Sequence, residues 1–523
     1  MRPIDESSKI RFAMASTGSD LESFLSPLYV DDSLVLRLSR DLCTTFKQLS
    51  AESKDQFLPT PISESILRRT DGADHGRYLA IDIGGTNLRV GFIELLGGAD
   101  RTTTDGESPS RIRRLLEKSW AIGEPLKTKN EDSLFAWIGQ CIASVVKDGV
   151  TAFNIDPTVD LPMGVTFSFP MIQRSLSEAT LMPMGKGFAF SSHLDLGSQL
   201  LKGYESALVD SLPRIRIAAI ANDAVATLVS FIYQVPTAEN QKAVMGLICG
   251  TGSNATIPLK LSSLHPDKRP AAVSILSEQN GEDVRIAVNT EWSINGSATP
   301  LRKLGLVSRW DIELDEAGEI PGFQPLEYMT AGRYLGELGR LILVDYITSV
   351  LRVPEETLPS KIRTRFGLTT TFLSHYRPAE KRTLLDKLEN EFPLENERTE
   401  FQWTEEIANA LYRIAKAIEL RAAGIIAAAI IGLLSCAEEI PLDSEASRSR
   451  RSTAPQELVV GYTGGCISHF QDYLQHCQAF LDKILSLESG FAPVRVVLSP
   501  CHDGGITGAG ILVPAALASH RAS

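Results

Sequence analysis

Apolar runs and helical periodicity alternate along the chain, which is typical of an α/β protein. Residues 1–60 look helical and polar, and the two prolines of FLPTPI should stop any helix there. Uninterrupted apolar runs predict buried strands further along. These runs lie at 78–83, 88–95, 163–169, 216–222 and 244–257, and two short strand–turn units follow at 458–465 and 494–505.

Apolar residues at helical spacing predict the helices. Polar, low-complexity loops are predicted at 97–114 and 437–456. An apolar helix should close the chain. The other predicted helices cover 131–147, 193–209, a stretch from about 224, and a stretch from about 325 through 404–435.

Two of the predicted strands run into glycine turns, LAIDIGGTNLR at 79–89 and VMGLICGTGSNATI at 244–257. Gly84 and Gly85 let main-chain N–H groups converge on an anion, because no Cβ stands in the way. Asp82 at the strand end can hold a metal-bound water, and Thr86 can donate to a phosphate oxygen. An ordinary Gly-Gly hairpin is the alternative. The repeated unit predicts two related α/β lobes, each with a phosphate turn.

Composition excludes several classes of protein. A chain of 523 residues exceeds one simple core, so two domains are expected. The net charge of -12 argues against a nucleic-acid or anionic-membrane surface. Seven scattered cysteines without a CxxC pair suit a reducing compartment and predict neither zinc nor disulfides.

The sequence shows neither a leader nor a membrane span. The start, MRPIDESSKIRF, lacks the apolar core of a signal peptide. The longest uncharged run, Ala422 to Cys436, is too short to span a membrane and is predicted to be a buried helix. We expect a cytoplasmic protein that binds no nucleic acid.

Asp223 follows the apolar run RIAAIAN and opens a predicted helix. The helix N-terminus would keep its carboxylate ionised. Such a carboxylate can accept the proton of a hydroxyl that attacks a γ-phosphorus. Asn-Asp before a helix is equally a good N-cap, and the local sequence favours neither reading.

The chain resembles the hexokinase family from about residue 20 to the C-terminus. Seven motifs occur in the order seen in that family: IDIGGTNLRV, TFSFP, Lys-Gly-Phe at 186–188, AND at 221–223, GTGSNA, NTEW and EYMTAGRYLGELGRLIL. The resemblance implies an actin-like ATPase (ribonuclease H-like) duplicated fold, with two lobes around a cleft. The small lobe would be 76–221, completed by a C-terminal helix at about 506–523, and the large lobe 1–75 and 222–505.

The same resemblance assigns roles to single residues. Asp223 would be the catalytic base, and Lys186 a cation that complements charge in the transition state. Without the resemblance, each of these residues has an ordinary interpretation. Lys186 would be a surface lysine, Ser168 a core hydroxyl, and Glu291 and Glu327 solvated acids. Amides and carboxylates suit a sugar because each hydroxyl both donates and accepts. The implied sugar-binding residues are Ser168, Asn222, Asp223, Asn254, Glu291 and Glu327.

The resemblance also implies ATP with Mg²⁺. No side chain is expected to ligate the metal directly, although Asp82 could hold it through water. Four of the implied nucleotide-binding residues, at 464–465 and 503–504, fall in generic glycine turns where the family binds adenosine. The implied nucleotide-binding residues are Asp82, Gly84, Gly85, Thr86, Asn87, Arg89, Gly250, Thr251, Gly252, Ser253, Gly464, Gly465, Asp503 and Gly504.

Departures from glucose-type members cluster at the sugar pocket. Those members read Trp-Thr-Lys-Gly-Phe, Asn-Asp-Thr-Val-Gly-Thr and Glu-Trp-Gly, where this chain has Gly185 and Ala224 for the threonines and Ser293 after Glu-Trp. Lost hydroxyls and volume weaken glucose recognition and leave space for a bulkier 2-substituent.

The motifs PMGKGF, EWSING and GFQPLEYMTAGRYLGELGRL resemble the fungal N-acetylglucosamine kinase branch. We therefore expect an N-acetylglucosamine kinase that is a monomer or weak homodimer, with a small-molecule sugar and ATP as its partners. A glucose/mannose hexokinase or glucokinase is one alternative. A catalytically weak hexokinase-like regulatory protein is another.

Overall fold

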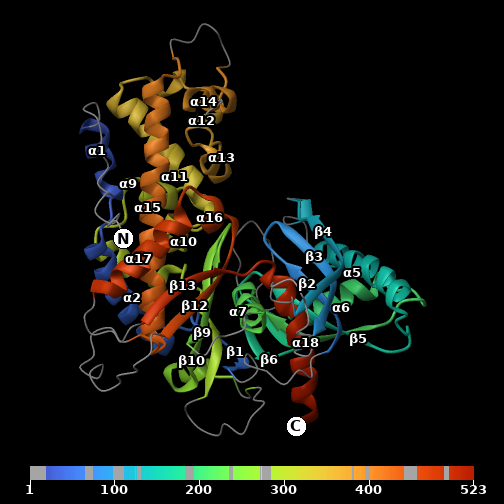
Figure 1. Ribbon diagram of the computed structural model, residues 1–523. Helices are drawn as coiled ribbons and strands as arrows, with labels where there is room; N and C mark the ends of the chain where they lie inside the picture. The colour runs from blue at the N-terminus through green and yellow to red at the C-terminus, as the bar shows by residue number, and fades with distance from the viewer. Residues whose placement is uncertain are drawn as a thin grey trace, which may run out of the picture.

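Two bodies, each built on a mixed β-sheet, make up the computed structural model (Figure 1). Leu79, Ile81 and Ile83 of one strand are buried on one face of their sheet, and Ala80 between them is buried on the other. Both faces of that sheet are therefore covered. The structure describes residues 19–64, 75–97, 111–123, 125–126, 131–182, 194–234, 240–270, 273, 284–379, 382–394, 401–440, 456–487 and 494–522.

The five strands of the first sheet lie in the order β4-β3-β2-β5-β8. The first three form an antiparallel meander, and β5 and β8 continue the sheet parallel to β2. The bounds are β2 (His75–Ile83), β3 (Asn87–Leu96), β4 (Ile112–Ala121), β5 (Leu161–Phe167) and β8 (Ile215–Ala221).

The second sheet repeats this topology in the order β11-β10-β9-β12-β13. Again three strands form a meander and two follow parallel to its first strand. The predicted duplicated, actin-like fold is thereby confirmed. The bounds are β9 (Gln241–Cys249), β10 (Ser253–Lys260), β11 (Arg285–Asn289), β12 (Gln456–Thr463) and β13 (Val494–Pro500).

Several strands were not predicted from the sequence, and the edge strand β1 is one of them. Helix α2 (Asp32–Glu52) already ends at Glu52, ahead of the prolines of FLPTPI, so they are not what stops it. The prolines lie in β1 (Leu58–Ser63), which pairs antiparallel with β11. β1 is the edge strand of its sheet, so its prolines remove no ladder hydrogen bond on the outer side. The hairpin of β6 (Met171–Ser175) and β7 (Glu178–Leu181) was also not predicted.

Both predicted loops end earlier in the structure than the sequence suggested, because a strand begins before the predicted C-terminal end of each loop. β4 begins at Ile112, within the predicted loop at 97–114, because its backbone pairs antiparallel with β3 from that residue on. β12 begins at Gln456, within the predicted loop at 437–456. Residues 98–110 and 441–455 lie outside the described part of the chain.

Helices cover both sheets. α5 and α6 pack on one face of the first sheet and α18 on the other. α7 packs on β9 of the second sheet and against α18, so these two helices join the lobes (Figure 1). The helix bounds are α1 (Ser19–Leu25), α5 (Glu131–Phe153), α6 (Leu196–Glu205), α7 (Asp223–Gln234), α8 (Ala298–Lys303), α9 (Arg309–Glu316), α10 (Pro325–Thr330), α11 (Gly332–Asp345), α12 (Ser360–Arg363), α13 (Thr370–His375), α14 (Leu384–Glu391), α15 (Glu405–Cys436), α16 (Gly465–His469), α17 (Tyr473–Leu487) and α18 (Gly504–Ala522).

The α7–α18 contact depends on Gly508. A Cβ at this position would overlap the carbonyl oxygen of Ala226 on α7. We expect Gly508→Ala to lower the free energy of unfolding by about 1–3 kcal/mol, because the two backbones must separate. Urea unfolding followed by circular dichroism measures the change.

Gly197→Ala in α6 is the matched control. The nearest atom to an added Cβ would be the Ser177 carbonyl oxygen at 3.4 Å, so alanine should leave stability unchanged or raise it. Equal stability of the Gly508→Ala and wild-type proteins would contradict the close-packing argument.

Helix α15 crosses the core of the large lobe. It is the one described helix that is long and apolar enough to span a membrane, yet 94% of its apolar window is buried inside the protein. Its fully buried Arg421 binds Asp311 of α9 through two hydrogen bonds, of 2.6 and 2.8 Å. These features are typical of a core helix, as predicted for the run from Ala422.

Candidate active site

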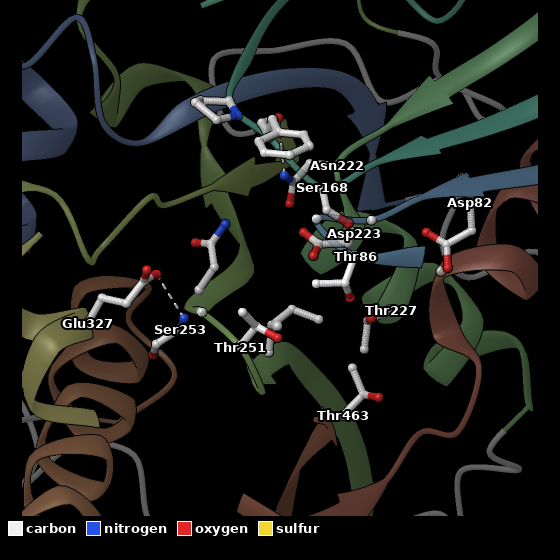
Figure 2. A pocket seen from close by; sticks show the side chains of 18 of the residues that line it. Asp82, Thr86, Ser168, Asn222, Asp223, Thr227, Thr251, Ser253, Glu327 and Thr463 are labelled. Carbon is white, nitrogen blue, oxygen red and sulfur yellow. Dashed lines mark hydrogen bonds between the residues drawn. The ribbon is translucent and has the colours of Figure 1, made fainter. Parts of the chain in front are cut away.

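A cleft of about 460 Å³ opens between the two sheets. Figure 2 shows side chains from both lobes turned toward it, with Asp82 and Thr86 from one lobe and Thr251 and Glu327 from the other. Sixteen of the residues expected from the sequence line it: Asp82, Gly84, Gly85, Thr86, Asn87, Arg89, Ser168, Asn222, Asp223, Thr251, Gly252, Ser253, Asn254, Glu291, Glu327 and Gly504.

The first glycine turn joins β2 to β3. The Gly84 N–H donates to the Asn87 carbonyl over 2.9 Å, and the Ile122 N–H donates to the Thr86 carbonyl over 2.8 Å. The turn is thus a hairpin connection, which was the alternative to a phosphate-binding turn, and it also lines the cleft. Ser168 follows β5, and its N–H donates to the Ile83 carbonyl over 3.0 Å.

An ion-pair network lies behind this turn. Arg89 on β3 donates to Asp82 over 2.6 Å and to Asp503 over 2.6 Å, and Arg114 contacts Asp503 at 2.9 Å. Burial raises the pKa of Asp82 above its ordinary value, although the charge of Arg89 opposes this shift. The carboxylate of Asp503 thus links β3 and β4 to the start of α18. Asp503 itself does not line the cleft, although a nucleotide contact was expected of it.

Asn222 and Asp223 stand together at the start of α7, and both line the cleft. The Asn222 side chain accepts from the Ala224 N–H over 2.9 Å and so caps α7. Asp223 is the first residue of that helix, half-buried, and lines the cleft. The Asp223 carboxylate also accepts from the Ala224 N–H over 2.9 Å, so this residue both contributes to the cap and faces the cleft.

The second glycine turn joins β9 to β10. The first residues of β10, Ser253 and Asn254, follow it directly. The Gly250 N–H donates to the Gly252 carbonyl over 2.9 Å. Ser253 is buried: its N–H donates to Glu327 over 3.1 Å, and its hydroxyl accepts from the Trp292 indole over 3.1 Å. These bonds tie Ser253 to Glu327 and Trp292, which differs from the phosphate contact expected of it.

Three polar side chains meet at the ends of β10 and β11. Asn254 donates to Asn289 over 2.8 Å, and Asn289 donates to Glu291 over 2.8 Å. Asn254 and Glu291 line the cleft, whereas Asn289 is buried behind them. Amide and carboxylate groups in one wall provide both donors and acceptors for a polyhydroxylated ligand.

Four of the expected nucleotide residues do not line the cleft. They are Gly250, Gly464, Gly465 and Asp503. Gly464 has a φ of +129°, and a Cβ there would overlap the Cys249 carbonyl, so this glycine lets the β12–α16 turn touch the β9–β10 turn. Thr463, one residue earlier, lines the cleft instead.

The described residues fit a phosphate chain. Gly504 and Gly505 open helix α18 at the cleft wall, where the N–H groups of a first turn attract an anion. The Thr227 hydroxyl lines the same region, fully buried and without a hydrogen-bond partner among the described residues. A Cβ on Gly505 would lie 2.6 Å from the Asp82 carboxylate, so only glycine leaves that carboxylate undisturbed.

Several residues that line the cleft were not predicted from the sequence. Thr227 and Thr463 carry the hydroxyls just described, and Gln324 adds an amide at the start of α10. Ile294 and Phe323 add apolar surface to the same wall. A signal existed for most of them: Phe323 and Gln324 lie in the quoted stretch GFQPLEYMTAGRYLGELGRL, Ile294 lies in EWSING, and Thr227 ends the segment that begins with Asn222 and Asp223. Thr463 lies in no quoted motif.

The substitutions on which the sugar identity was based do not all reach the cleft. Ala224 is fully buried and Ser293 is 2% exposed; neither lines the cleft, and the Ser293 hydroxyl donates to the Ser253 carbonyl. Gly185 and the expected catalytic cation Lys186 lie outside the described residues. Ala224 and Ser293 therefore do not contact a ligand in the cleft directly.

Comparisons with known proteins agree with this architecture. Hexokinase from Schistosoma mansoni, solved in complex with glucose, superposes with a TM-score of 0.71 at 22% identity, covering 95% of this chain and 98% of that one. Hexokinase-1 of Schizosaccharomyces pombe is 29% identical over 460 residues, which are 86% of this chain and 81% of that protein. Hexokinase-1 of Spinacia oleracea is 27% identical over 445 residues, 84% of this chain and 79% of that protein.

Two family models, each described as hexokinase, match nearly the whole chain between them. One matches residues 20–233, which hold the first glycine turn and Asp223, and the other matches residues 244–515, which hold the second turn. The chain therefore belongs to the hexokinase family of sugar kinases.

Proposed function

We propose that the protein transfers the γ-phosphoryl group of ATP to O6 of N-acetylglucosamine. The observation that supports a kinase most directly is one cleft that contains both glycine turns, the start of α18 and Asp223. The amide and carboxylate side chains of Asn254, Glu291 and Glu327 line the same cleft and suit a sugar.

Asp223 is the proposed general base. Its carboxylate would accept the proton of the sugar 6-hydroxyl as that oxygen attacks the γ-phosphorus, and the bond to the β–γ bridging oxygen breaks. Main-chain N–H groups of the glycine turns and of the first turn of α18, together with the Thr227 hydroxyl, would hold the phosphates. Bound Mg²⁺ would neutralise phosphate charge, and Asp82, which lines the cleft, would hold it through water.

Support for N-acetylglucosamine comes from the EWSING segment. Its Ile294 lines the cleft, three residues after Glu291, and Phe323 lies in the same lining. Apolar side chains beside sugar-binding amides provide a contact for an acetamido methyl group. The second candidate is glucose, favoured by the names of the relatives and by the glucose complex of the Schistosoma enzyme.

A coupled ADP-release assay with N-acetylglucosamine, glucose and mannose separates the candidates. We expect the highest kcat/KM with N-acetylglucosamine. Preferred turnover of glucose would establish the second candidate, and no turnover of any sugar would favour a regulatory protein.

Ile294→Ala tests the proposed source of the preference. It should lower kcat/KM for N-acetylglucosamine about 5- to 50-fold, as expected for lost apolar contacts, while glucose turnover changes little. Ile312→Ala, at an isoleucine that is 48% exposed, is the control. An unchanged ratio between the two sugars would contradict the role of Ile294.

A further inference from the structure

Asn289 is a buried polar residue behind the sugar-side wall of the cleft. It is the last residue of β11, is 3% exposed, and pairs with Thr256 of β10 and Leu58 of β1. It does not line the cleft. A buried amide at a strand end needs polar partners, because burying one without hydrogen bonds is costly.

Both ends of the Asn289 amide bind residues that do line the cleft. Its oxygen accepts from Asn254 Nδ2 over 2.8 Å, and its nitrogen donates to Glu291 Oε1 over 2.8 Å. Asn254 Nδ2 also lies 3.3 Å from the same Glu291 oxygen. The amide therefore sets the rotation of the Glu291 carboxylate and, through the other end, that of the Asn254 amide.

The backbone of Glu291 needs external support. Its φ of +45° lies in the left-handed region, which costs a non-glycine residue stability unless its surroundings hold it there. Gln56 Nε2 donates to the Glu291 carbonyl over 2.9 Å, and the Phe57 N–H donates to the Thr290 carbonyl over 2.9 Å. The segment just before β1 thus fixes the backbone, and Asn289 fixes the side chain.

We propose that Asn289 is a positioning residue for the phosphoryl acceptor, which orients Glu291 and Asn254 without touching the sugar. This role rests on the proposed function, in which Glu291 and Asn254 hold sugar hydroxyls. The Asn289 amide N–H donates to one carboxylate oxygen of Glu291, and this bond fixes the direction in which the carboxylate can accept from the ligand.

Asn289→Asp tests the role with almost no change of shape. At pH 8 an aspartate cannot donate to Glu291 and adds a like charge, so the KM for the sugar should rise about 10- to 100-fold, while the KM for ATP stays near the wild-type value. Near pH 5.5 a proton shared by the two carboxyl groups would restore the bond and part of the affinity. Asn254 also faces the Glu291 carboxylate, Gln56 and the Ile294 N–H contact its backbone carbonyl, and Glu327 is a further acid that lines the cleft.

Two further variants separate positioning from stability. Thr60→Val removes a buried hydroxyl that donates to the Ala287 carbonyl over 2.7 Å in the same β1–β11 pair, and it should lower thermal stability without a pH-dependent change in sugar KM. Asn289→Ser keeps a small polar group that is too short to reach Glu291. It should raise the sugar KM equally at both pH values, and it serves in the same assay if Asn289→Asp does not fold.

The KM values of the wild-type protein and of all variants are measured with the sugar that the wild-type protein turns over fastest. An active wild-type protein with an unchanged sugar KM in the Asn289 variants would overturn the positioning role and leave the kinase function standing. Equal increases in KM for sugar and ATP would overturn it as well. Absence of turnover by the wild-type protein would overturn the proposed function, and this inference with it.

Discussion

Asp223→Asn is expected to lower kcat by about 10²–10⁴-fold, the contribution of a positioned general base. Asparagine has the same shape but cannot accept the proton of the sugar hydroxyl. The fold should survive, because Asn222 caps α7 through its bond to the Ala224 N–H. Sugar binding, measured by calorimetry, should change little, while steady-state ADP release reports the loss of kcat.

The matched control is Asp195→Asn. Asp195 is the N-cap residue of α6, where its side chain accepts from the Ser198 N–H over 2.7 Å, and it does not line the cleft. The same chemical change there should leave kcat near the wild-type value. Near-wild-type kcat in Asp223→Asn would remove this residue from the proposed mechanism.

Arg421→Met is expected to lower the free energy of unfolding by about 3–5 kcal/mol, because it leaves the Asp311 carboxylate buried without its cation. Arg421 is fully buried, and its guanidinium binds both carboxylate oxygens of Asp311 and the Leu306 carbonyl. Urea unfolding monitored by tryptophan fluorescence measures the loss.

A double variant shows whether the unpaired charge causes the effect. Arg421→Met combined with Asp311→Asn removes both charges and should recover part of the loss. Lys54→Met breaks an ion pair of 2.7 Å in which both side chains are about two-thirds exposed, and it should leave the unfolding midpoint unchanged. Equal effects of Arg421→Met and Lys54→Met would contradict the argument.

The duplicated sheets were predictable because their signals are local. Apolar runs that end in glycine turns mark β2–β3 and β9–β10, and the strand predictions near 78–95 and 244–257 match the observed elements closely. The edge strand β1 was missed because its prolines forbid a central strand, and only the pairing with β11 shows that an edge was available.

Individual side chains were harder to predict than elements. Asn289 belongs to the quoted motif NTEW, but nothing in the sequence says that its amide lies behind Glu291 rather than in the cleft. Ala224 stands next to the proposed base, yet it faces the protein interior, because successive residues of a helix point in different directions. Distances between segments far apart in sequence depend on how the sheets pack.

The C-terminal helix α18 has a consequence for synthesis on the ribosome. It covers one face of the first sheet, whose last strand, β8, ends at Ala221, so that face stays bare while the whole second lobe is being made. A nascent chain with exposed apolar strands is prone to aggregate and is a substrate for chaperones. Translation that stops before α18 should therefore release an insoluble product, even though every strand of the first sheet is complete.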